Sequence, residues 1–143
     1  MQLLSGAEPV EPEALTDAAR VALGALLVEA AKADGVYLDA ERTTIVQVLA
    51  SRYELSAAEA EALCIKAEQA QSEAVDLVRF TRAIKDAVPF EDRVGVVEAL
   101  WQVIYADEDR DHRESALVRK LAGLLYVPDR EAGLARQRVT GES

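Results

Sequence analysis

Apolar residues recur along this chain at the three- and four-residue spacing of amphipathic helices, which is the main sequence signal of helical structure. The segment from Val21 to Val28 is apolar on nearly every side, and such a helix belongs in the centre of a bundle. The apolar residues between Val94 and Tyr105 indicate a second central helix. The whole pattern predicts helices over residues 13–33, 39–53, 57–71, 75–87, 90–106, 113–125 and 128–138.

These elements predict an all-α bundle of about seven helices, in a single domain over residues 13–138 with tails at 1–12 and 139–143. A chain of 143 residues is long enough to bury a core of its own, and its scarcity of glycine and proline favours helix. Cys64 falls on the buried stripe of the third helix, whereas Trp101 and Tyr105 lie one turn apart on the fifth. We expect all three side chains in the core.

Particular residues mark the predicted helix ends. Gly35 tolerates the left-handed conformation that closes a helix, and Asp39 is the predicted N-cap of the next one. Ser56 and Glu59 have the spacing of a capping box ahead of the third helix. Pro89 suits the first turn of the fifth helix, since proline has no backbone N–H to satisfy.

The chain contains an internal repeat, because two segments coincide when it is shifted by 73 residues. In each copy an apolar helix ends in Ala-Asp, and a Glu follows seven residues after that Asp. Recurrence at a fixed spacing carries more weight than any single residue. The repeat units are predicted over about 13–72 and 75–138, with two superposable halves. The matching pairs include Leu27 and Leu100, Asp34 and Asp107, Glu41 and Glu114, and Tyr53 and Tyr126.

The repeated acidic turns have two interpretations. Asp34 and Asp107 each end a predicted helix, where the macrodipole disfavours negative charge. In the first interpretation the turns are structural: each Asp accepts N–H groups of the loop, and the following Glu suits a helix N-terminus. In the second, the carboxylates bind a divalent cation such as calcium or magnesium, which prefers several oxygen ligands. The candidate ligands are Asp34, Asp39 and Glu41 in the first turn, and Asp107, Glu108, Asp109, Asp111 and Glu114 in the second.

The second turn is not an EF-hand, although Asp107, Asp109 and Asp111 resemble the opening of that calcium-binding loop. An EF-hand requires glycine at its sixth position and a bidentate Glu at its twelfth. Here those positions are His112 and Val118. Any cation site in this turn is therefore of another kind.

Net charge narrows the set of partners. The formal charge of −10 opposes binding to nucleic acid or to an anionic membrane, and it favours cations or basic protein surfaces. One cysteine allows no internal disulfide, and the N-terminus lacks the features of a secretory signal. The segment from Val21 to Val28 is too short to span a bilayer. We expect a cytoplasmic protein.

Three segments bring a known family into view: Leu27 to Gly35 (LVEAAKADG), Leu100 to Asp107 (LWQVIYAD) and Asp76 to Thr81 (DLVRFT). They resemble motifs of the TerB-like family of tellurite resistance proteins, and the resemblance covers about residues 18–137. It implies a pseudo-twofold helical bundle in a bacterial cytoplasmic protein, with an acidic surface that could hold metal. Members are linked to tellurite and stress resistance through association with other proteins. The second copy departs from the first at one position of this motif, since Glu108 stands where the first copy has Gly35.

The sequence offers no catalytic constellation. His112, the one histidine, lies in a charged turn and is expected to be a surface cap, and a zinc site would need more His or Cys ligands. We therefore expect no enzyme and no cofactor other than a divalent cation. The predicted function is a non-catalytic acidic interaction module with one or more protein partners. The alternative is a divalent-cation-binding or sensing domain that uses the acidic turns.

Overall fold

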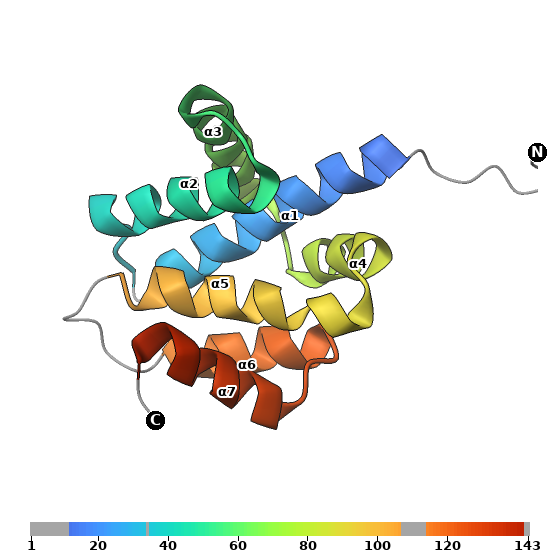
Figure 1. Ribbon diagram of the computed structural model, residues 1–143. Helices are drawn as coiled ribbons and strands as arrows, with labels where there is room; N and C mark the ends of the chain where they lie inside the picture. Colours follow the sequence, from blue (N-terminus) through green and yellow to red (C-terminus); the bar gives the residue numbers. More distant parts are fainter. Residues whose placement is uncertain (1–11, 34, 107–113, 142–143) are drawn as a thin grey trace, which may run out of the picture.

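The computed structural model describes residues 12–33, 35–106 and 114–141, and these form a helical bundle (Figure 1). No strand occurs in this part of the chain, so the all-α prediction is confirmed. None of the described helices is both long and apolar enough to cross a membrane. The elements are α1 (Pro12–Ala31), α2 (Asp39–Tyr53), α3 (Ala57–Glu73), α4 (Val78–Ala87), the 3-10 turn η1 (Phe90–Asp92), α5 (Val94–Ile104), α6 (Glu114–Leu124) and α7 (Asp129–Thr140).

The helices α1 and α5 pack against each other in the centre of the bundle, as predicted. Apolar side chains from Ala22 to Val28 are at most 2% exposed, and Trp101 is 1% exposed. A Cβ atom built on Gly24 would lie 2.6 Å from the Cβ of Ala67, so α1 and α3 approach closely only because α1 carries a glycine there.

The other helices surround this central pair. Figure 1 shows α2 and α3 on one side of it and α6 and α7 on the other. The helix α4 packs against α1 and also contacts α6. Its buried side chains are Phe80, Thr81 and Ile84, which have the three- and four-residue spacing of one helix face.

Several predicted helix boundaries differ from the structure by two residues or more. The helix α1 ends at Ala31, two residues before its predicted end, and α3 continues to Glu73, two residues beyond its own. The fourth helix begins at Val78 and not at residue 75, because the Asp76 side chain accepts the Val78 N–H at 3.0 Å and forms a turn there. The predicted fifth helix is divided into η1 and α5. The last helix continues to Thr140, two residues beyond its predicted end.

The capping predictions have mixed outcomes. Ser56 and Glu59 form the predicted box, with the Glu59 N–H donating to Ser56 Oγ at 3.1 Å and the Ser56 N–H donating to Glu59 Oε1 at 2.8 Å. The prediction for Asp39 is wrong, since this residue is the first of α2 and Leu38 occupies the N-cap position. Glu41 compensates by accepting the Leu38 N–H on Oε1 at 2.8 Å.

Helix positions along the chain follow the 73-residue shift. The helix α1 ends at Ala31 and α5 ends at Ile104. The helix α3 starts at Ala57, and α7 starts at Asp129. The helix α4 lies between the two sets of three and has no counterpart in this order. Superposition of the two halves stays a prediction.

Candidate functional site

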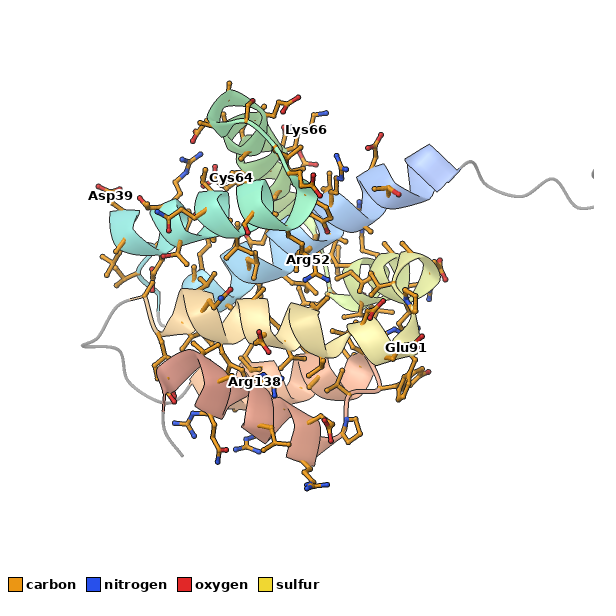
Figure 2. All side chains as sticks on the ribbon, in the orientation of Figure 1. Asp39, Arg52, Cys64, Lys66, Glu91 and Arg138 are labelled. Carbon is orange, nitrogen blue, oxygen red and sulfur yellow. The ribbon has the colours of Figure 1, made fainter. Side chains whose placement is uncertain are left out.

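The first acidic turn separates its candidate ligands. Asp34 lies outside the described residues. Asp39 is exposed at the start of α2 (Figure 2), whereas the Glu41 side chain is 0% exposed and caps its own helix through the Leu38 N–H. This hydrogen bond gives Glu41 the structural role of the first interpretation, and it leaves a cation at this turn as an open prediction.

The second acidic turn cannot be assessed in the same way. Asp107, Glu108, Asp109, Asp111 and His112 lie outside the described residues, as does the side chain of Glu114, although Glu114 itself opens α6. Within the described part of the chain, no group of three or more His, Cys, Asp or Glu side chains is arranged to hold a metal ion. The cation site at the second turn stays a prediction.

A polar network that the sequence analysis did not identify joins α2 to α3. The Arg42 guanidinium donates to both carboxylate oxygens of Glu61, at 3.0 and 2.7 Å. It also donates to Glu68, with Nε at 2.8 Å from Oε2. The Tyr37 hydroxyl donates to the same Oε2 at 2.6 Å, which fixes the loop ahead of α2 against α3. The sequence contains one indication of this network: Glu61 and Glu68 are seven residues apart, so both lie on one face of a helix.

This network sets the protonation of its members. Burial alone would raise the pKa of Glu68, but hydrogen bonds from Arg42 and Tyr37 outweigh it, so this pKa is lowered. The hydrogen bond from Arg42 lowers the pKa of Glu61. Burial raises the pKa of the neighbouring Cys64 thiol to about 11. Since the thiolate is the nucleophilic form, Cys64 is a core residue here and not a reactive one.

A groove of about 520 Å³ runs between α2 and α5, and we call it the α2–α5 groove. Its walls come from α2 in the first half of the chain and from the central helix α5 in the second half; Figure 1 shows these two helices side by side. Small side chains and polar groups both contribute to its walls. The lining residues are Thr44, Gln47, Val48, Ser51 and Arg52 from α2, and Gly95, Glu98, Ala99 and Gln102 from α5.

The 73-residue shift carries α2 towards α6 and the α5 positions onto α1. The helix α4 packs against α1 and contacts α6, the two helices that correspond to the walls of the groove. Of the nine positions that correspond to the groove lining, Ala22, Ala25, Leu26, Leu121 and Leu125 are buried, Glu29, Leu117 and Leu124 are half-buried, and Lys120 is exposed.

Comparison with known proteins identifies one family. A family model described as tellurite resistance protein TerB matches residues 20–137, which is most of the chain and nearly the range over which the sequence resemblance was predicted. No curated protein and no solved structure matches the chain.

Proposed function

We propose that this chain, which belongs to the TerB family of tellurite resistance proteins, is a non-catalytic module that binds another protein through the α2–α5 groove. The observation that carries the proposal is the relation between this groove and α4. The helix α4 packs against α1 and contacts α6, whereas the groove between their counterparts α5 and α2 is open. The groove is thus placed to receive a helix.

The walls of the groove suit reversible binding. Gly95 and Ala99 present little side chain on α5, and the Arg52 guanidinium that lies over Gly95 is the end of a long side chain that can move aside for a partner. Gln47 and Gln102 offer donors and acceptors, and Arg52 and Glu98 add one charge of each sign. Interfaces that form and separate are about as polar as the rest of a protein surface. A groove with this lining is stable in water when empty and can still take a partner.

The charge of the chain indicates the kind of partner. With 26 acidic and 16 basic residues, the protein attracts basic protein surfaces and repels nucleic acid and anionic membranes. We propose a basic protein in the bacterial cytoplasm as the partner. We propose that the module acts by association, which is what the resemblance to the TerB-like family implies.

A substitution at Gly95 tests the groove directly. A Cβ on Gly95 would lie 3.1 Å from Arg52 Nη1, the mobile end of a long side chain, so Gly95→Leu can fill the groove without breaking the core. Replacing glycine within a helix also favours helix formation. Gly133→Leu is the matched control, because nothing lies within 4 Å of a Cβ built at that helical position.

The experiment is capture from extracts of the native cell, grown with and without tellurite, followed by quantitative mass spectrometry. Wild type and Gly133→Leu should retain the same partner, and Gly95→Leu should lose it. Circular dichroism and thermal melts must show that both variants are folded. Identical capture by all three proteins, or capture of nothing in either condition, would end the proposal.

A divalent-cation site in the acidic turns is the second candidate, and the recurrence of the acidic turn after 73 residues favours it. Clustering of acids in the second turn imposes repulsion on the empty protein, and a bound cation would relieve it.

Thermal melts test this candidate. Millimolar calcium, magnesium or manganese should raise the melting temperature by mass action, also in moderate monovalent salt. The double change Asp107→Asn with Glu114→Gln should remove most of that rise and leave the metal-free protein at least as stable. If the acids are only helix caps, metal changes nothing and the double change costs about 1–2 kcal/mol.

A further inference from the structure

An apolar notch lies at the corner where η1 meets the start of α7, apart from the α2–α5 groove. Its volume is about 330 Å³, and its lining residues are Phe90, Val94, Val127 and Pro128, with Glu91 and Glu131. We call this site the Phe90 notch (Glu91 is labelled in Figure 2). It shares no lining residue with the α2–α5 groove. Phe90 is 55% exposed, although burial of a phenylalanine side chain contributes favourable free energy.

The corner that carries Phe90 is held in place by Arg93. The guanidinium of this residue donates to the carbonyl oxygens of Val88 at 3.1 Å, Lys85 at 3.2 Å and Leu125 at 3.3 Å. Two of these carbonyls belong to the C-terminal end of α4 and one to that of α6, where the helix dipoles favour a cation. The guanidinium carbon also lies 5.7 Å from the centre of the Phe90 ring. A notch built on fixed elements loses little entropy when it binds.

Carboxylates lie on both elements that form the notch, and two of them, Glu91 and Glu131, line it. Glu91 and Asp92 lie on η1, and Asp129 and Glu131 lie in the first turn of α7. All four are exposed, and the exposed cation beside them in the sequence is Arg130. Acids at the start of α7 suit its dipole, which accounts for their place on the helix. The helix dipole does not account for the exposed aromatic ring of Phe90, which lies between these two acidic elements.

We propose that the Phe90 notch binds an extended segment of a partner protein, in which one or two large apolar side chains are flanked by Lys or Arg. The apolar side chain would contact Phe90 and Val127, and the flanking cations would face Glu91 and Glu131. Buried aromatic anchors dominate the affinity of most interfaces, and complementary charge around them adds specificity. This inference goes beyond the α2–α5 groove, because it adds a separate surface and defines the chemistry of its ligand.

Fluorescence anisotropy with synthetic peptides tests the proposal on the full chain. The probe is a fluorescein-labelled peptide with two leucines between pairs of basic residues (KRLLRK). Two companion peptides replace the leucines by serine (KRSSRK) or the basic residues by glutamate (EELLEE). Wild type should bind the first peptide, more weakly as salt rises, and should bind each companion about tenfold more weakly or worse.

The variants then locate the site. Phe90→Ala should weaken binding of KRLLRK about tenfold, and Glu131→Lys should weaken it at low salt. Ile65→Ala, at another exposed apolar residue (53%), is the matched control and should bind as wild type does. The proposal fails if no peptide binds, if KRSSRK binds as well as KRLLRK, if Phe90→Ala and Ile65→Ala behave alike, or if vesicles of phosphatidylcholine and phosphatidylserine bind in a Phe90-dependent way. Gly95→Leu should leave peptide binding unchanged, so the groove and the notch can fail separately.

Discussion

The two sides of the central helix pair differ in what covers them. On the open side, the α2–α5 groove presents Arg52 and Glu98. The positions 73 residues away on the other side are Leu125 and Ala25, and both are 0% exposed. A helix that is permanently in place needs an apolar wall, because burial of apolar surface is what holds it. A wall of polar groups can stay open in water, which suits a surface that binds reversibly.

The two halves also attach their third helix in different ways. Charged groups join α2 to α3, through Arg42 with Glu61 and Glu68. The second half uses aromatic residues: Trp101 Nε1 donates to the Ala132 carbonyl at 3.0 Å, and Arg136 Nε donates to the Tyr105 hydroxyl at 2.6 Å. Ion pairs thus join α2 to α3 and aromatic residues join α5 to α7, and the four predictions below test how much such contacts contribute on the two sides.

The largest effect is expected from Phe80→Ala, which weakens the cover on the closed side. Phe80 is 3% exposed and is the largest buried side chain of α4. Its removal should cost about 3–5 kcal/mol of unfolding free energy, through lost burial and the cavity left behind. Urea unfolding measures this, with Val78→Ala on the exposed face of the same helix as the control. Equal losses in the two variants would show that α4 is not held by its apolar face.

The next effect concerns the residue that holds the end of α4. Arg93→Ala removes three hydrogen bonds from a cation to backbone carbonyls, and we expect a loss of about 2–3 kcal/mol. Arg93→Lys should recover only part of it, since an ammonium group cannot span three carbonyls as a planar guanidinium does. Full recovery by lysine, in the same unfolding experiment, would show that charge alone matters at this position.

The third prediction replaces two polar residues of the α2–α5 groove by the apolar residues found 73 positions away. A smaller change in stability is expected, together with a clear change in association. The double change Ser51→Leu with Arg52→Leu introduces the residue type found at Leu124 and Leu125. The free energy of unfolding should change by less than about 1 kcal/mol, because the substituted residues are exposed. Analytical ultracentrifugation should detect self-association through the new apolar surface.

The control for that experiment adds the same two leucine side chains at another place on the protein surface. Gln69→Leu with Ser72→Leu adds two leucines to exposed positions of α3. If this variant associates as strongly as the groove variant, the association reflects nonspecific hydrophobic contacts and not the shape of the groove.

The smallest effect is expected from Arg42→Ala, because the ion pairs of Arg42 are partly exposed and contribute about 1 kcal/mol or less. The pKa of Glu68 lies below its ordinary value of 4.5 in the folded protein. Its contribution is therefore present above about pH 4.5 and is lost as the pH falls through the lower folded pKa. Urea unfolding at pH 7, 4.5 and 3 should show wild type and variant converging at low pH. A constant difference across this range would contradict the role assigned to Glu68.

The sequence by itself determined the secondary structure and much of the core. The apolar periodicity located α1 and α5 as the central helices, and it placed Cys64 and Trp101 inside. Ser56 and Glu59 predicted their capping box for the same reason: these features depend on residues within one or two turns of each other. Asp39 was misassigned as a cap even so, because α2 begins at Asp39 itself, and Glu41, two residues further along, accepts the N–H of the N-cap residue Leu38.

Only the tertiary structure decided the surfaces on which the functional proposals rest. The partners of Arg42 lie 19 and 26 residues away, and Arg93 meets Leu125 across 32 residues. No local pattern specifies such pairs. The α2–α5 groove is open, whereas α4 packs against α1 and contacts α6, the helices that correspond to its walls. An amphipathic sequence shows that a helix has an apolar face, but the packing of the whole chain decides which neighbour that face covers.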